Sequence, residues 1–124
     1  MGVTTVTATI TNLDDRDKQV TGKFLVDTGA GYSVVPYEMA KKIELKPKRT
    51  QEFSLADGTT ISRKLGYALM KVDFTDQRKG VREAPCLVVI GQKGDSALLG
   101  LLTLETMGLI VDPFRREFRP MKLH

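Results

Sequence analysis

The chain has 124 residues, the length of one ordinary domain, and 41% of them are hydrophobic, which is enough for a single core. Its 19 Lys and Arg residues against 15 Asp and Glu residues give a formal net charge of +4, too small a bias to indicate nucleic-acid binding by itself. The single cysteine, Cys86, excludes an intrachain disulfide. The single histidine, His124, leaves no zinc site of the usual kind, and no Ser-His or Cys-His pair unless the terminus folds back. Carboxylates remain as the candidates for acid–base chemistry.

The amino-terminal segment does not have the features of a targeting signal. It lacks a basic start and a continuous apolar stretch, so we expect no signal peptide. Uncharged runs fall well short of the roughly 18 apolar residues that a membrane-spanning helix needs. Because Cys86 lies in an apolar stretch, we interpret it as a buried core thiol without a role in chemistry. These patterns predict a soluble, cytoplasmic protein in a reducing compartment.

The first third of the chain predicts a hairpin and a short helix. Residues 3–11 alternate apolar and Thr positions in the period of a half-buried strand, and residues 19–26 form a second strand after a polar turn. The second strand leads directly into Asp27. Pro36 then precedes residues with helical spacing, which predicts a helix of about two turns.

The middle of the chain predicts further strands. From residue 51, an Asp57-Gly58 turn lies between two alternating stretches, a pattern typical of a β-hairpin. Residues 81–90 follow a polar turn and end in a nearly continuous apolar run, as a buried strand does. The sequence Ala-Leu-Leu-Gly at 97–100 predicts a short buried strand that ends at Gly100.

The last part of the core predicts a helix and a final strand. Residues 101–108 have helical spacing with Gly108 placed as a C-terminal cap, and residues 109–112 form a strand before Pro113. We expect one domain over 1–124 with its core at about 3–113. The class is mainly β, with one or two short helices.

Residues 114–124 form a basic tail. We interpret it as a solvated end, against the alternative of a segment that binds an acidic partner or nucleic acid. Interleaved Phe114, Phe118 and Met121 indicate partial packing.

One motif carries specific chemistry. The apolar run Phe-Leu-Val precedes Asp27-Thr28-Gly29-Ala30, which is similar to the active-site signature of aspartic proteases. The triplet alone is short and more often a turn at the end of a strand. Support comes from residues 97–100, about seventy positions later. They resemble the hydrophobic-hydrophobic-Gly element that retroviral-type proteases place beneath the active-site loop, just before a helix.

Order and spacing extend this resemblance over residues 3–113. The chain is most similar to the single-domain retropepsin-like proteases of bacteria and archaea, and it also resembles the protease domain of DNA-damage-inducible proteins. The resemblance implies a closed retropepsin-like (acid protease) β-barrel that functions as a homodimer. It also implies an aspartic endopeptidase that acts on polypeptides without a metal or cofactor. Asp27, Thr28 and Gly29 would then be catalytic.

The same resemblance predicts residues that contact substrate. They lie in the active-site loop, the hairpin turn and the second motif: Ala30, Gly31, Asp57, Gly58, Thr59, Leu98, Leu99 and Gly100. The Asp57-Gly58 hairpin is either a flap over the substrate or an ordinary surface turn. Asp95 is a solvated turn residue or part of the cleft edge. In retroviral enzymes a carboxylate and an arginine pair at the positions of Gly31 and Leu101, so that contact is missing here.

A chain with one Asp-Thr-Gly triplet cannot form a carboxylate pair internally. We therefore expect two copies to associate through residues 109–112, the N-terminal strand or both. Two alternatives remain: a catalytically inactive dimeric peptide-binding or regulatory module on the same fold, and a basic-tailed binding protein that uses the barrel as a scaffold.

Overall fold

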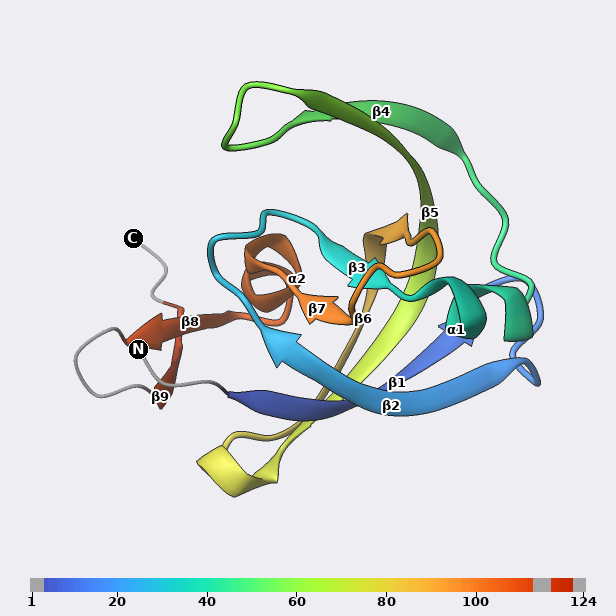
Figure 1. The fold of residues 1–124 in the computed structure, drawn as a ribbon. Helices are drawn as coiled ribbons and strands as arrows, with labels where there is room; N and C mark the ends of the chain where they lie inside the picture. Colours follow the sequence, from blue (N-terminus) through green and yellow to red (C-terminus); the bar gives the residue numbers. More distant parts are fainter. Residues whose placement is uncertain (1–3, 113–116, 122–124) are drawn as a thin grey trace.

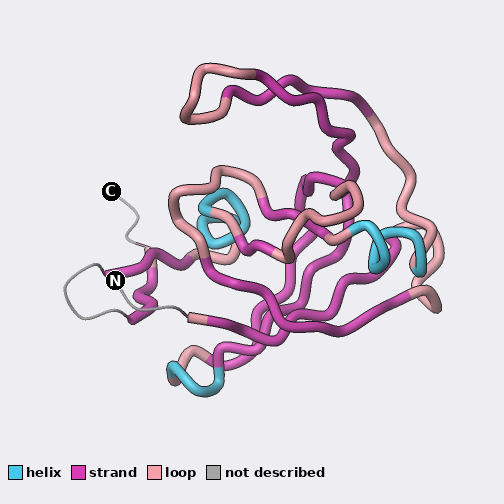
Figure 2. The backbone as a smooth tube through the Cα atoms, viewed as in Figure 1, coloured by secondary structure: helices cyan, strands magenta, loops and turns pink. Residues whose placement is uncertain are grey.

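The computed structural model describes residues 4–112 and 117–121, and most of them lie in strands (Figure 2). The elements in chain order are β1 (Thr5–Asn12), β2 (Gln19–Val26), β3 (Ser33–Val35), α1 (Tyr37–Lys42), β4 (Arg49–Ser54), β5 (Thr60–Phe74), η1 (Thr75–Gln77), β6 (Gly80–Ile90), β7 (Leu98–Leu99), α2 (Leu101–Thr106), β8 (Leu109–Asp112) and β9 (Glu117–Pro120). Within these ranges, no helix is long and apolar enough to cross a membrane.

The strands close into a mixed barrel in the order β1-β2-β7-β3-β6-β5, and β5 pairs back with β1 (Figure 1). Most neighbours are antiparallel, but β2 pairs with β7, and β3 with β6, in parallel. The short β7 therefore lies between β2 and β3 and pairs with both of them. The predicted class, a mainly β closed barrel with two short helices, is confirmed.

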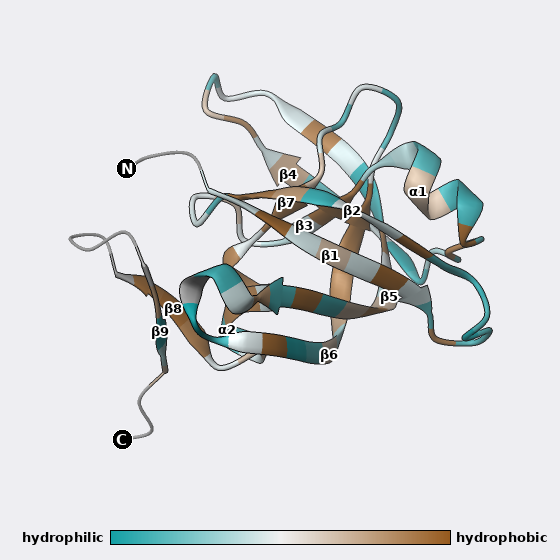
Figure 3. Ribbon diagram, turned by 90° about the horizontal axis from the view of Figure 1, so that it is seen from below, coloured by the Kyte–Doolittle hydropathy of each residue, from teal (hydrophilic) through white to brown (hydrophobic). Residues whose placement is uncertain are grey.

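The core is built by the alternation that the sequence shows. Hydrophobic and hydrophilic residues alternate along the barrel strands (Figure 3), so one face of each strand points inward. The largest fully buried side chains include those of Phe24, Phe74, Ile10, Leu99 and Leu104. Cys86 is also buried, as predicted, and burial raises the pKa of its thiol.

The β4–β5 hairpin extends beyond the barrel. β5 is 15 residues long; its later part pairs with β1 and β6, whereas its first part pairs with β4. The two strands arch over one end of the barrel, and the turn between them lies at the far end of the arch (Figure 1). We call residues 49–63, from the start of β4 to Arg63, the flap hairpin. Gly58 has a φ of +88° in its turn, a conformation that glycine adopts without strain.

The carboxyl-terminal segment differs from the predicted solvated tail. Glu117–Pro120 forms β9, which pairs antiparallel with β8. Phe118 is only 3% exposed, and its ring packs edge-on against Phe74 with centroids 4.7 Å apart. The expectation of partial packing is thus met at Phe118, because burying an aromatic ring gains more than solvating it. Phe114 lies outside the described residues.

Candidate active site

Asp27 lies at the end of β2, where the chain leaves the barrel wall. Its backbone N–H donates a hydrogen bond to the carbonyl of Leu99 in β7 at 3.0 Å. Its carboxylate Oδ1 accepts a hydrogen bond from the N–H of Gly29 at 2.9 Å. A side chain at position 29 would place its Cβ 3.1 Å from that oxygen. Glycine therefore allows the loop to fold tightly around a partly exposed carboxylate.

The loop after Asp27 rests on the second motif. The Ala30 N–H donates to the Asp27 carbonyl at 3.1 Å, which closes the turn. The carbonyl of Ala30 then accepts the N–H of Leu101 at 2.8 Å, and that of Gly31 accepts the N–H of Leu102 at 2.9 Å. Two backbone hydrogen bonds thus join the loop to the start of α2. They lie at Gly31 and Leu101, the positions where this chain lacks the carboxylate and arginine of retroviral enzymes.

Gly100 is required by this close approach. A Cβ on Gly100 would lie 2.5 Å from the backbone carbon and oxygen of Tyr32, and 2.9 Å from the carbonyl oxygen of Ala30. The Gly100 N–H donates to Ser33 Oγ at 2.9 Å, and that hydroxyl also bonds to the hydroxyl of Thr103 at 2.6 Å. The sequence element at 97–100 therefore lies beneath the loop, as predicted.

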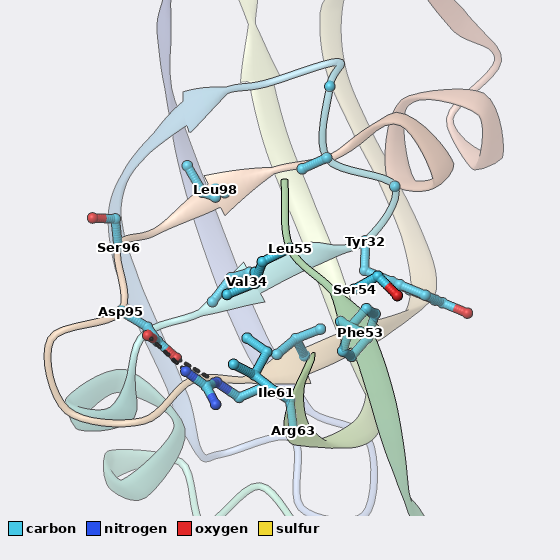
Figure 4. Close-up of a pocket in the computed structure, with 14 residues that line it drawn as sticks. Tyr32, Val34, Phe53, Ser54, Leu55, Ile61, Arg63, Asp95, Ser96 and Leu98 are labelled. Carbon is cyan, nitrogen blue, oxygen red and sulfur yellow. Dashed lines mark hydrogen bonds and ion pairs between the residues drawn. The ribbon is translucent and has the colours of Figure 1, made fainter. Parts of the chain in front are cut away.

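A cleft of about 410 Å³ opens between the loop and the flap hairpin. Figure 4 shows side chains from the loop, from both flap strands and from the turn before β7 surrounding it. Its lining is largely apolar, including Val34, Phe53, Ile61, Val89 and Leu98. Such a cleft has the size and polarity of a site that takes uncharged side chains.

The predicted site residues fall into three groups. Gly29, Ala30, Gly31 and Leu98 line the cleft, and Asp27 and Thr28 directly precede this lining in the loop. Leu99 and Gly100 are buried beneath the loop, so they support it and do not face the cleft.

Asp57, Gly58 and Thr59 form the third group, at the exposed tip of the flap hairpin. The Thr59 hydroxyl and N–H both donate to Asp57 Oδ1, at 2.6 and 2.9 Å, and they lower the pKa of the Asp57 carboxyl. These contacts fix the shape of the turn. The flap hairpin lines the cleft through its two strands and the residue after β4, and not through its tip. These lining residues are Phe53, Ser54, Leu55, Ile61 and Arg63.

The structure decides between the two interpretations of Asp95 and adds Arg63 and Tyr32, which the sequence did not indicate. Arg63 reaches across to Asp95, so Asp95 belongs to the cleft wall and is not merely a solvated turn residue. Tyr32 meets Phe53 edge-on with centroids 5.7 Å apart. Alternation places Ile61 and Arg63 on one face of their strand, which would have been the available signal.

The Asp95 carboxylate is held in its charged form. Hydrogen bonds from Arg63, with a smaller contribution from the N–H of Gln92, lower its pKa below the ordinary value. A pKa that is lower in the folded state stabilises the fold above the unfolded-state pKa. The contribution is lost as the pH falls through the folded-state pKa. The ion pair is therefore fully formed at neutral pH.

Metal chemistry has no support in the described part of the chain. Within it, no three His, Cys, Asp or Glu side chains are grouped to hold a metal ion. The groups that the loop presents for chemistry are the Asp27 carboxylate and backbone N–H groups.

Comparison with known proteins identifies the family. The model for the gag-polyprotein putative aspartyl protease matches residues 16–106, well over half of the chain, including Asp27, the flap hairpin and Gly100. No curated protein matches the sequence. The fold is similar to the crystal structure of a retropepsin-like aspartic protease from Rickettsia conorii. The TM-score is 0.50 and the identity 24%, over 94% of this chain and 88% of that one. The motifs, the closed barrel and the family match agree: the chain belongs to the aspartyl protease family of gag polyproteins and has a retropepsin-like fold.

Proposed function

We propose that this protein is an aspartic endopeptidase whose active site is completed by two copies of Asp27, one from each subunit of a homodimer. The observation that supports this most strongly is the position of the Asp27 carboxylate. It is partly exposed, it is held by the Gly29 N–H, and the residues that follow it line a cleft beneath a hairpin. A turn that served only to end β2 would need neither the cleft nor the buried support at Gly100.

The chemistry follows from a pair of carboxylates. Two carboxylates about 3 Å apart cannot both ionise, so they share a proton; aspartic proteases are the usual example. The ionised member takes a proton from a water, whose oxygen attacks the carbonyl carbon of the scissile peptide. The protonated member donates a hydrogen bond to the carbonyl oxygen. One carboxyl of the pair then gives a proton to the amine nitrogen, the C–N bond breaks, and the carboxylic acid and amine products leave. The hydroxyl of Thr28 would contact Thr28 of the second subunit across the dimer axis and support the two loops.

The substrate would be an extended polypeptide. An extended peptide can pair through its backbone with strand edges, while alternate side chains enter pockets. The apolar lining of the cleft favours uncharged, hydrophobic side chains there.

The direct test is cleavage of a peptide library by the purified protein, followed by mass spectrometry. We expect cuts between hydrophobic residues, and inhibition by a statine-containing peptide that imitates the tetrahedral intermediate. Peptide binding without cleavage would contradict the proposal and support the inactive binding module.

Dimerisation is a requirement of the mechanism and is the first prediction. β8 and β9 form a two-stranded sheet separate from the barrel sheet, so strands from a second copy could extend it across a dimer interface. Sedimentation equilibrium over a range of concentrations should show a mass twice that of the chain. A single-chain mass at every concentration, with the statine peptide present, would leave the proposed site incomplete.

The flap hairpin provides the second prediction. Gly58→Val forces a β-branched residue into a φ of +88°, although a Cβ there would meet no atom within 4 Å. The change should therefore distort the turn without disturbing the core, and reduce kcat/KM by roughly tenfold because the flap closes poorly. Gly58→Asn is the matched control, since Asn tolerates positive φ. Equal turnover by all three proteins would reduce the hairpin to a surface turn.

A further inference from the structure

An ion pair forms part of the cleft wall. Arg63 Nε donates to Asp95 Oδ2 at 2.9 Å, and Nη2 donates to Oδ1 at 3.3 Å, so the contact is bidentate. The two side chains are only 17% and 27% exposed. Bidentate geometry and partial burial distinguish this contact from the exposed pairs that contribute little.

The pair stands at one end of an otherwise uncharged cleft. Figure 4 shows Arg63 and Asp95 pointing toward each other, with Ile61 and Val34 nearby and the Tyr32–Phe53 contact on the opposite side. Among the described residues that line the cleft, these two carry the charges. Because the charges cancel, this end of the cleft offers a ligand no net charge.

Other contacts use much of the remaining hydrogen-bonding capacity of the pair. Arg63 Nη1 donates to the carbonyl of Ser62 at 3.0 Å, and Asp95 Oδ2 accepts the N–H of Gln92 at 2.8 Å. A charged substrate side chain would have to compete with contacts that are already made. Removing one partner would instead leave a partly desolvated charge facing the cleft.

We infer that Arg63 and Asp95 determine specificity, because their mutual neutralisation makes this end of the cleft accept uncharged side chains and reject both acidic and basic ones. The inference rests on the proposed peptide-cleaving function and adds the residues that select the substrate. Each charge is already paired with the other, so neither can form an ion pair with a charged side chain of the substrate.

The alternative is a purely structural contact. Asp95 closes the turn before β7, since its N–H donates to the Gln92 carbonyl at 2.9 Å, and Arg63 belongs to the flap hairpin. A pair that only tied the flap to this turn would affect stability and overall turnover. It would not change which side chains are preferred. Substrate preference is therefore the readout that separates the two roles.

The experiment removes one charge at a time and keeps a polar side chain at each position. Asp95→Asn leaves Arg63 unbalanced, and Arg63→Gln leaves Asp95 unbalanced; the double charge swap Arg63→Asp/Asp95→Arg restores neutrality. The probe is a peptide library that carries Gln, Glu or Lys at each position in turn. Cleavage is measured directly, and binding is measured in an Asp27→Asn background. Lys93→Gln removes a charge from the same turn outside the cleft and serves as the control.

At one peptide position, Asp95→Asn should favour Glu over Gln by roughly tenfold, and Arg63→Gln should favour Lys by a similar factor. The wild type, the double swap and Lys93→Gln should favour Gln. Cleavage with unchanged preferences would overturn the specificity role while leaving the endopeptidase proposal intact. Binding with shifted preferences but no cleavage would support the specificity role and overturn the endopeptidase proposal. If no library peptide is bound or cleaved, both are overturned.

Discussion

Asp27→Asn should abolish peptide cleavage, with a loss on the order of a thousandfold or more in kcat. The amide has nearly the shape of the carboxylate, and its oxygen can still accept the hydrogen bond from the Gly29 N–H. It cannot take a proton from water, however, and in a homodimer both copies change at once. The fold and the dimer should therefore survive while the chemistry is lost.

The measurement compares wild-type and mutant turnover of one fluorogenic peptide, together with the melting temperature and the mass of each protein. Asp73→Asn is a matched control, because Asp73 is an exposed carboxylate in β5 that does not line the cleft. Its turnover should equal that of the wild type. Undiminished cleavage by Asp27→Asn would show that another group activates the water.

Gly100→Val should be the most damaging substitution to the fold near the site. Its Cβ would lie 2.5 Å from the backbone of Tyr32, and backbone atoms cannot move aside as the end of a flexible side chain can. Either the active-site loop lifts away from α2 or β7 is displaced. We expect a loss of about 1–3 kcal/mol or more in the free energy of unfolding, as for overpacked cores, and loss of activity as well.

Urea denaturation followed by circular dichroism would measure this loss. The control is Gly31→Ala in the same loop, where a Cβ would meet no atom within 4 Å. That variant should change the free energy of unfolding by no more than about 0.5 kcal/mol. If the two glycines proved equally tolerant, the tight packing of the loop on Gly100 would not be a requirement of the fold.

Local sequence signals predicted much of this fold. The strand at 19–26 and the strand at 109–112 have the predicted bounds, because alternating or apolar runs between turn residues leave little choice of register. The helix after Pro36 and the helix that ends before Gly108 follow from local backbone preferences. Short motifs at a characteristic separation indicated the aspartic protease family, and they are the basis for proposing Asp27 as a catalytic residue.

What the sequence did not predict depends on distant partners. β3 has three residues, and it is a strand because it pairs with β6 and β7. β9 pairs with β8, and the ring of Phe118 packs against that of Phe74, which is distant in the sequence. Arg63 and Asp95 are likewise 32 positions apart. No local pattern in the sequence indicates which of several Arg and Asp residues will form an ion pair. The Arg63–Asp95 pair is therefore seen only in the structure.

The unbroken course of β5 determines how the flap hairpin can move. From Lys64 onward, β5 is paired residue by residue with β6, and the loop before β4 is fastened to it where the Lys48 N–H donates to the Leu65 carbonyl at 2.7 Å. The flap thus has no loop hinge on its β5 side. If the hairpin opens for substrate, the opening would come from bending or twisting of the strands beyond Lys64 and Leu65, which are held by this pairing. Arg63 is the first residue beyond these pairs, and its ion pair with Asp95 ties this part of the strand to the turn before β7.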